Sequence, residues 1–200
     1  FLKDLKKEHV KFPVILKPRF GFSSRNCYIV ESLTELLKTY EFLDLILQKE
    51  RLPFPLQDEK SKIIIQRYID GNEYGADIIN DLNGKFVGCY IKKKIAMRSG
   101  ETEIAETLEM PLFQNYAKLI SNNICHLGNL DVDFIVDNTG QIFIIDLNPR
   151  FGGGYPFTHS AGVNLTKAIV AWAQNKTLSI NDLRMKVGLT LSKSYIISKH

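Results

Sequence analysis

The order of apolar and polar positions divides the chain into short strands and a few helices. Strands are predicted where apolar residues form a short run between turn residues, or alternate with polar residues. Residues 98–109 are polar and show neither pattern, so we expect this segment to be irregular. The predicted strands cover residues 12–18, 27–30, 63–69, 73–79, 85–95, 131–136 and 141–147.

Helices are predicted at three places. Ser32 and Glu35 have the spacing of an N-terminal capping box, which predicts a helix from there to about Gln48. Apolar residues at helical spacing predict further helices over residues 111–127 and 163–173. Because the strands come in hairpins and do not alternate regularly with helices, the pattern favours an α+β fold over a doubly wound parallel sheet.

Composition adds limits on size, location and partners. The 200 residues are 44% hydrophobic, which is enough for one sizeable domain or two joined lobes. The formal net charge of +4 fits a small anionic ligand and is too weak to argue for nucleic acid. No apolar run approaches the ~18 residues of a membrane span. Three distant cysteines without metal-binding spacing indicate a reducing compartment, so we expect a cytoplasmic protein.

The hairpin predicted around residues 137–140 carries an acidic face. A symmetric turn at Asp137-Asn138-Thr139-Gly140 would place Asp131 directly opposite Asp146, with Asp133 diagonal to it. Asn148 falls on the same face because side chains alternate along a strand. The opposite face is expected to be apolar and to belong to the core: Val132, Phe134, Val136, Phe143, Ile145 and Leu147.

Such an acidic face predicts a metal site. Like charges opposite each other destabilise a sheet unless a positive group compensates. Carboxylate and amide oxygens suit Mg²⁺, which binds one or two carboxylates and completes its shell with phosphate and water. Arg150 follows directly and is suited to an anion, and the glycines at 152–154 allow the backbone to turn sharply or approach a ligand. The alternative is the solvated face of an amphipathic hairpin.

The end of this hairpin resembles the E-x-N-P-R motif of ATP-grasp enzymes. It reads Ile145-Asp146-Leu147-Asn148-Pro149-Arg150, with aspartate in place of the usual glutamate. The segments that follow, Phe151-Gly152-Gly153-Gly154 and Ser160-Ala161-Gly162-Val163-Asn164, are similar to the branch that contains the carbamoyl-phosphate-synthase large subunit. The resemblance covers residues 12–176. It implies an α+β ATP-grasp fold, in which two lobes with antiparallel sheets grip ATP between them.

The resemblance also implies a division of the chain. Residues 1–69 would form the first lobe, with the phosphate flap and the adenine strand. Residues 70–176 would form the second lobe, with the ribose, metal and triphosphate sites, and residues 177–200 a C-terminal extension. Family members usually carry a further N-terminal domain, so we expect this chain to be part of a longer protein that has one.

Individual residues take their expected roles from the same resemblance. The implied metal ligands are Asp133, Asp146 and Asn148. The residues expected to contact phosphate or acceptor, and so to be catalytic, are Lys94, Arg98 and Arg150. The residues expected to bind nucleotide are Lys17, Ser23, Ser24 and Arg25 at the phosphates, Gln66, Arg67, Tyr68 and Ile69 at the adenine, Glu73 at the ribose and Lys94 at the triphosphate.

Several of these positions have simpler interpretations. The flap has one glycine, Gly21, where the family has a glycine-rich loop, and Gln66 stands where a glutamate is common. For Lys92-Lys93-Lys94 the alternative is a solvated basic edge that discourages strand aggregation. Ordinary surface charge is the alternative for Lys17, Arg25 and Glu73.

Together these features predict the core of an ATP-dependent ligase. ATP and Mg²⁺, or Mn²⁺ in its place, are the expected cofactors. A small carboxylate would attack the γ-phosphate to give an acyl phosphate, from which an amine or similar nucleophile displaces phosphate. One alternative is a non-catalytic or degenerate ATP-binding module, favoured slightly by the single flap glycine and by Asp146. Another is a basic nucleic-acid-binding domain, against which the acidic hairpin argues. No nucleic-acid or membrane partner is expected, and the sequence indicates no oligomeric state.

Overall fold

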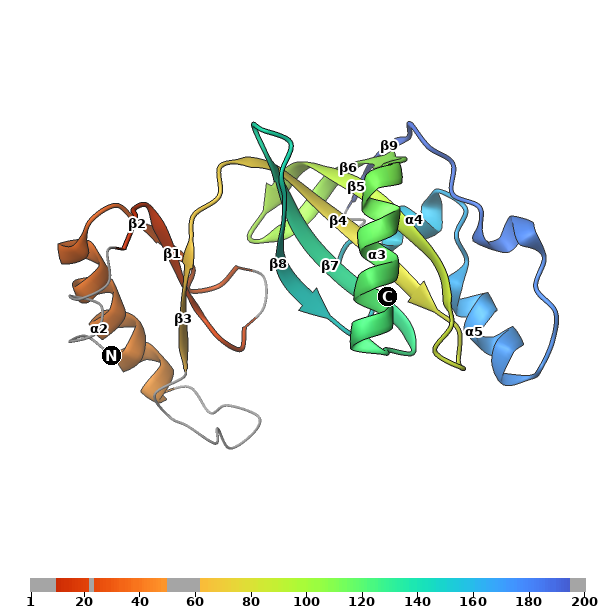
Figure 1. The fold of residues 1–200 in the computed structure, drawn as a ribbon, viewed down its shortest axis with the longest axis horizontal. Helices are drawn as coiled ribbons and strands as arrows, with labels where there is room; N and C mark the ends of the chain where they lie inside the picture. Colours follow the sequence, from red (N-terminus) through yellow and green to blue (C-terminus); the bar gives the residue numbers. More distant parts are fainter. Residues whose placement is uncertain (1–9, 22–23, 50–61, 195–200) are drawn as a thin grey trace, which may run out of the picture. The chain divides into compact units, whose positions relative to one another are not determined.

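The computed structural model describes residues 10–21, 24–49 and 62–194. The chain divides into two compact units, Phe1–Ile69 and Asp70–His200, and each has an antiparallel sheet of its own (Figure 1). None of the described helices has the length and apolar character needed to cross a membrane.

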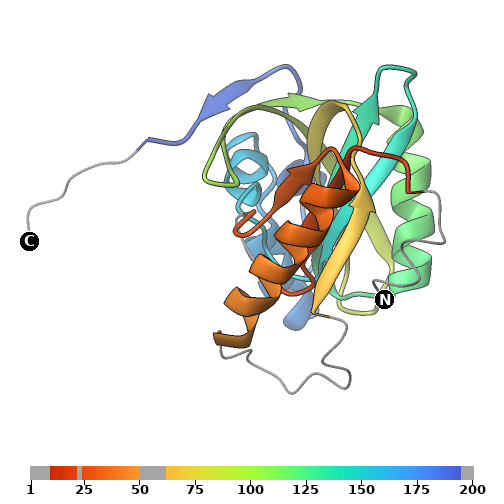
Figure 2. The same cartoon turned by 90° about the vertical axis from the view of Figure 1, so that its left-hand side faces the viewer.

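The first unit is a small sheet covered on one face by a long helix. Its strands are β1 (Val14–Pro18), β2 (Tyr28–Val30) and β3 (Ile63–Arg67), in the order β2-β1-β3. Helix α2 (Leu33–Lys49) lies along this sheet (Figure 2). It begins as predicted, because the Ser32 hydroxyl accepts the Glu35 N–H at 3.3 Å. The core between helix and sheet contains Val14, Leu16, Val30, Leu36, Leu43 and Leu47.

The second unit is a six-stranded sheet with helices on both faces (Figures 1 and 2). In sheet order its strands are β8 (Ile142–Asn148), β7 (Gly128–Asp137), β4 (Gly71–Asn80), β5 (Phe86–Arg98), β6 (Glu101–Leu108) and β9 (Thr190–Ser192). Helix α3 (Pro111–Ile124) covers one face. The other face meets α4 (Tyr155–Ser160), α5 (Leu165–Ala173) and the 3₁₀ helix η2 (Ile180–Leu183).

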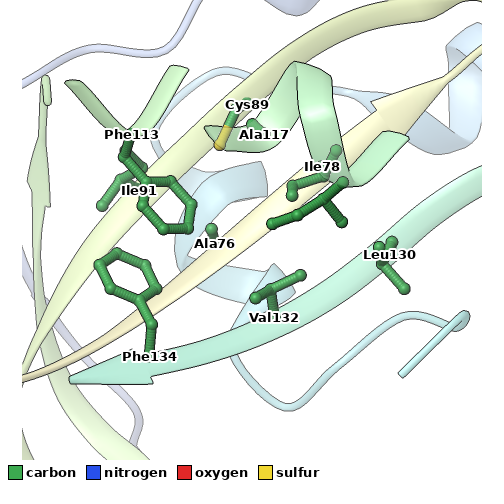
Figure 3. Packing of buried hydrophobic residues seen from close by; sticks show 10 residues of the cluster. Ala76, Ile78, Cys89, Ile91, Phe113, Ala117, Leu130, Val132 and Phe134 are labelled. Atoms are coloured by element: carbon green, nitrogen blue, oxygen red, sulfur yellow. The ribbon is translucent and has the colours of Figure 1, made fainter. Parts of the chain in front are cut away.

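The core under α3 is apolar and aromatic (Figure 3). The ring of Phe113 stacks on that of Phe134 with 3.9 Å between centroids, and Phe134 stacks on Tyr74 at 5.2 Å. Because side chains alternate along a strand, this packing leaves the opposite face of β4, β5 and β7 to a different set of residues. The buried residues around the rings include Ala76, Ile78, Cys89, Ile91, Ala117, Leu130 and Val132.

Part of the opposite face is covered by α5 and the segment after it. Ile79 and Tyr90 of the sheet pack in one cluster with Leu165 of α5. The Tyr90 hydroxyl also donates to the Leu183 carbonyl at 2.6 Å, which holds the η2 segment to the sheet. Polar side chains occupy the part of this face that runs from β5 to β8.

The prediction of an irregular segment over residues 98–109 is wrong, because Glu101–Leu108 forms strand β6. Its buried positions hold small or polar residues, namely Thr102, Ala105 and Thr107. The Thr107 hydroxyl donates to the Lys186 carbonyl at 2.8 Å and accepts the Leu189 N–H at 3.0 Å. The strand is therefore held partly by polar contacts, which the hydropathy of the segment does not reveal.

Candidate functional site

The loop of the β7–β8 hairpin is one residue longer than predicted. The Asp137 N–H donates to the Gln141 carbonyl at 3.0 Å, so three residues rather than two form the loop. Gly140, the last of them, has φ of 85°, the left-handed conformation that a three-residue hairpin loop requires. The Asp137 carboxylate fixes this loop by accepting the Gln141 N–H at 2.9 Å. The register is shifted relative to a symmetric turn.

A bulge at Ile145 shifts the register again, since that residue has no partner on β7. Asp133 lies opposite Asp146, and Asp131 lies opposite Asn148. The predicted pairing of Asp131 with Asp146 is therefore wrong. The two shifts together amount to two residues, so the four polar side chains still share one face, as predicted.

Between the loop and the bulge the shift is a single residue, and the faces of β8 are exchanged there. Phe143 lies opposite Ile135 and so leaves the core face on which it was predicted. Ile142 packs against the core under α3 instead. Beyond the bulge the predicted faces return, and Leu147 lies opposite Val132.

Polar residues form two rows across this face of the sheet. The first row consists of Lys92, Gly75, Asp133 and Asp146, each opposite the next. The second consists of Tyr90, Asp77, Asp131 and Asn148. A Cβ atom at Gly75 would lie 3.7 Å from Lys94 Cε and 3.8 Å from Lys92 Cε. Both lysine side chains therefore pass within van der Waals distance of this position on β4.

Lys94 lies between two carboxylates. Its Nζ is 2.6 Å from Glu73 Oε1 and 2.8 Å from Asp133 Oδ1, and its side chain is 7% exposed. Burial alone would lower the pKa of Lys94, but the charges of Asp133 and Glu73 outweigh it and raise that pKa. Lys94 is therefore an ammonium at neutral pH. These carboxylates take two of its three N–H donors, and the third can serve a further acceptor such as a phosphate oxygen.

Asp133, Asp146 and Asn148 offer the hard oxygen ligands of a divalent ion. Burial raises the pKa of Asp133 against the opposing charge of Lys94, with smaller contributions from other carboxylates. Asn148 Nδ2 donates to Asp146 Oδ2 at 2.9 Å, so these two side chains adjoin. In the described ranges, no three His, Cys, Asp or Glu side chains converge as a metal site. Two carboxylates and an amide fit Mg²⁺, whose remaining ligands would be phosphate and water.

Asp131 ties the segment after β8 to the sheet. Arg150 Nη1 lies 3.7 Å from Asp131 Oδ2, while the Arg150 side chain remains 55% exposed and accessible to an anion. A Cβ at Gly152 would lie 2.1 Å from Asp131 Cγ, so this close approach requires glycine. Burial, with the charges of Asp133 and Asp77, raises the pKa of Asp131 to about 6. Asp131, which the resemblance does not include among the metal ligands, thus lies beside Arg150.

A buried polar network, which the sequence did not reveal, lies under this segment. The Asp77 carboxylate accepts from Lys92 Nζ and Thr158 Oγ1 on one oxygen and from Asn129 Nδ2, at 2.8 Å, on the other. Lys92 Nζ also donates to Thr158 Oγ1 at 2.8 Å, and Asn129 Nδ2 to the Arg150 carbonyl at 3.3 Å. The network joins three strands to α4. Its only sequence signal is a polar residue within an apolar strand, as at Asp77 and Asn129.

The nucleotide candidates of the first unit lie on both faces of its sheet. Lys17 and Gln66 point away from α2, since the residues beside them along each strand pack under that helix. Arg67 lies opposite the core residue Val14 and so points to the α2 side. Arg67 ends β3 and is exposed, Tyr68 is 36% exposed and Ile69 is half-buried. Strand alternation therefore places Lys17 and Gln66 together on the face away from α2.

The flap residues are only partly described. Ser24 and Arg25 are exposed, and Ser24 has φ of 50°. Ser23 lies outside the described residues.

Arg98 lies at the tip of the β5–β6 hairpin, outside the two rows. Ser99 and Gly100 form the turn there, with φ of 51° and 76°. The Arg98 side chain is 66% exposed, and its Nη1 is 3.4 Å from Glu103 Oε1. The solvated basic edge considered for residues 92–94 is wrong for Lys92, which is buried in the network, and for Lys94.

A profile of the ATP-grasp domain matches residues 10–159. The chain belongs to the ATP-grasp family. This confirms the ATP-grasp family that the segment at residues 145–150 predicted. The predicted α+β fold with antiparallel sheets is confirmed as well.

Two curated relatives of this ATP-grasp chain are carbamoyl phosphate synthases. The arginine-specific large chain of Bacillus subtilis (strain 168) is 23% identical over 154 residues, which is 72% of this chain and 14% of the relative. The carbamoyl-phosphate synthase of Methanobrevibacter smithii is 24% identical over 198 residues, or 90% of this chain and 47% of the relative. The chain thus spans less than half the length of either relative.

Solved structures with the same ATP-grasp fold include two enzymes. One is the biotin carboxylase domain of the 2-oxoglutarate carboxylase from Hydrogenobacter thermophilus, in complex with MgADP and bicarbonate. It has a TM-score of 0.70 at 20% identity, and the match covers 92% of this chain and 41% of that domain's chain. The L-amino acid ligase from Bacillus licheniformis has a TM-score of 0.68 at 18% identity and matches 94% and 46%. At these identities the likeness establishes the fold.

Proposed function

We propose that this chain is the nucleotide-binding core of an ATP-dependent ligase. It would phosphorylate a carboxylate to an acyl phosphate, which an amine or a similar nucleophile then attacks, as in a carbamoyl-phosphate-synthase-like reaction. The family and the relatives support a ligase. A neighbour that holds MgADP and bicarbonate supports ATP, Mg²⁺ and a carboxylate-like acceptor.

The observation that carries the proposal is the opposed pair Asp133–Asp146, with Asn148 adjoining Asp146 and the Lys94 ammonium on Asp133. We assign Asp133, Asp146 and Asn148 as ligands of Mg²⁺, or of Mn²⁺ in its place. When bound, the ion would neutralise negative charge on the phosphate oxygens. Acids placed opposite each other on a sheet are otherwise destabilising, so such a pair calls for a cation.

The basic residues of the chain have the complementary task. Lys17 and Lys94 would donate to phosphate oxygens of ATP, as point charges that do not require a fixed geometry. Arg150 would bind the acceptor carboxylate or the transferred phosphate through two parallel N–H groups, with Arg98 as a further contact. Fixed positive groups of this kind stabilise the charge of the transferred phosphoryl group where it develops.

The remaining assignments concern the rest of the nucleotide. Lys94 already binds Glu73 Oε1, which leaves the other Glu73 oxygen to accept from the ribose hydroxyls. The residues assigned to the adenine are Gln66, Arg67, Tyr68 and Ile69, and those assigned to the phosphates in the flap are Ser23, Ser24 and Arg25.

A module that binds ATP without turning it over is the second candidate. The flap has the single glycine Gly21, and Asp146 is one methylene shorter than the glutamate of the family motif. Both features would hold the ATP phosphates less firmly in place, and neither removes an assigned ligand of the metal ion. This candidate therefore shares the binding site with the ligase and differs from it only in turnover.

Calorimetric titration of the chain with ATP, with and without Mg²⁺, tests the proposal. We expect Mg²⁺-dependent binding that Asp146→Ala/Asn148→Ala loses and that Glu109→Ala, an exposed acid between β6 and α3, retains. Equal binding by wild type and the double variant would contradict the assigned metal ligands. Release of ADP in a screen of small carboxylates separates the ligase from the non-catalytic module.

Several further predictions accompany the proposal. They are the lobes 1–69 and 70–176 with an extension over 177–200, a preceding domain in a longer protein, a cytoplasmic location and the absence of nucleic-acid partners. Of the extension, residues 190–192 pair with β6 as β9, and residues 195–200 lie outside the described residues.

A further inference from the structure

We infer that Asn129 is a positioning residue for Arg150, which it holds in place for the transferred phosphate through the buried network centred on Asp77. The inference rests on the proposed function, because it takes the contact of Arg150 with that phosphate as given. Arg150 follows the edge strand β8, and its side chain is 55% exposed. An exposed side chain binds an anion in one geometry only where the backbone that carries it is held.

The segment that carries Arg150 has few contacts of its own to hold it. It runs from β8 to α4 and has glycines at residues 152–154, which allow the widest choice of backbone conformation. Its described backbone bonds are short-range: the Arg150 N–H donates to the Asn148 carbonyl at 2.7 Å, and the Tyr155 N–H to the Gly152 carbonyl at 3.1 Å. A fixed position for Arg150 therefore depends on contacts with the sheet.

Asp77 on β4 is linked to both ends of this segment. Its Oδ1 accepts from Asn129 Nδ2 at 2.8 Å, and the same Nδ2 donates to the Arg150 carbonyl at 3.3 Å. Its Oδ2 accepts from Thr158 Oγ1 on α4. Lys92 Nζ donates to both Asp77 Oδ2 and Thr158 Oγ1 and balances the charge of the fully buried carboxylate. The two oxygens of one carboxylate thus fix Arg150 and the helix that ends the segment.

Asp77 also sets the orientation of the Asn129 amide. A reversed amide would point its oxygen at the Asp77 carboxylate and at the Arg150 carbonyl, which are both acceptors. Asn129 is only 4% exposed, so water does not compete for its N–H groups. If the network merely fastened α4 to the sheet, loss of this amide would lower stability and leave the phosphate contact of Arg150 unchanged.

The ratio of the dissociation constants of MgADP and MgAMPPNP, measured by calorimetric titration of the chain, isolates the contribution of the γ-phosphate. We expect Arg150→Met to lower this ratio about tenfold or more, the effect of losing a hydrogen bond to a charged group. Asn129→Ala keeps the guanidinium but releases its backbone, and should lower the ratio about three- to tenfold. The double variant Asn129→Ala/Arg150→Met should match Arg150→Met alone, because Asn129 acts only through Arg150.

Asn80→Ala is the matched control. Asn80 is a buried asparagine of the same sheet, and its Nδ2 likewise donates to a backbone carbonyl, that of His126 at 2.9 Å. Its Oδ1 accepts from Ser121 of α3, so it lies on the opposite face of the sheet from the network. This variant should unfold at lower urea concentration than wild type and keep the wild-type ratio.

An unchanged ratio in Asn129→Ala, an equal fall in Asn80→Ala, or a further fall in the double variant overturns the inference and leaves the proposed binding of Mg-ATP intact. An unchanged ratio in Arg150→Met also overturns it, because Arg150 then has no contact with the γ-phosphate. If Asn129→Ala does not fold, Asn129→Ser keeps a polar group that is too short to bond both Asp77 and Arg150, and the same fall is expected of it. If wild type binds neither nucleotide in the presence of Mg²⁺, the proposed function fails and the inference fails with it.

Discussion

Replacing Lys92 by methionine should destabilise the second unit far more than an ordinary lysine substitution. Lys92 pairs with the fully buried carboxylate of Asp77, which would keep its bonds from Thr158 and Asn129 but lose its counter-charge. Removing one partner of a buried ion pair costs about 3–5 kcal/mol, because the other charge stays buried without compensation.

The double variant Asp77→Asn/Lys92→Met removes both charges. An asparagine at position 77 retains an acceptor for Asn129 and gains a donor for Thr158, so the network stays largely satisfied. We therefore expect a loss of only about 1–2 kcal/mol, comparable to a weakened hydrogen bond. The double-mutant cycle should give a coupling energy of at least about 2 kcal/mol.

Urea unfolding followed by the fluorescence of Trp172 is the assay. Trp172 is the single tryptophan of the chain and packs, partly buried, against the core cluster between α5 and the sheet, so its signal reports on the second unit. Lys93→Met serves as the control and should change the free energy of unfolding by less than about 0.5 kcal/mol. The reasoning is refuted if the double variant loses the sum of the single losses, or if Lys92→Met resembles Lys93→Met.

Two other substitutions test packing and pH dependence. Gly152→Ala places a Cβ 2.1 Å from the Asp131 carboxyl carbon and should lower the free energy of unfolding in urea by about 1–3 kcal/mol. Gly153→Ala is the control and should change it little, because its Cβ would lie 3.9 Å from Lys193 Nζ. Equal losses in the two variants would contradict the packing argument. Burial lowers the pKa of His126 although its Nε2 bonds the Ile78 carbonyl at 3.0 Å, so the folded state favours the neutral ring. That stabilisation is complete above the unfolded pKa of ~6.5 and is lost as pH falls through this value. Between about pH 7 and pH 5, the urea midpoint should therefore fall more in wild type than in His126→Gln. An equal fall in both proteins would contradict the argument.

The strands and helices that could be predicted were those with a clear apolar period. The capping box at Ser32 and the apolar positions of α3 placed two helices within a few residues of their observed ends. Strand β6 could not be found in this way, because Thr102 and Thr107 fill its buried positions. Its inner contacts are hydrogen bonds to segments distant in the sequence, and such partners are unknown before the fold is.

The residues of the candidate site could be predicted from the sequence, but the ion pairs and hydrogen bonds between them could not. The motif at residues 145–150 and the acids before it located the polar face. The burial of Lys92 was not foreseeable, since a lysine is buried only where a partner such as Asp77 compensates its charge, and that partner lies on another strand. The same holds for Lys94, whose sequence neighbours gave no sign of the two carboxylates that bind it.

The register of the hairpin links these features to function. In a symmetric turn, Asp133 would lie opposite Ile144, and the carboxylate held by Lys94 would face an apolar side chain. The left-handed Gly140 lengthens the loop by one residue, and the bulge at Ile145 adds the second shift that brings Asp146 opposite Asp133. Lys94, through its bond to Asp133, thereby becomes part of the proposed metal site. Two local departures from regular strand geometry, the longer loop at Gly140 and the bulge at Ile145, thus decide which acids act together.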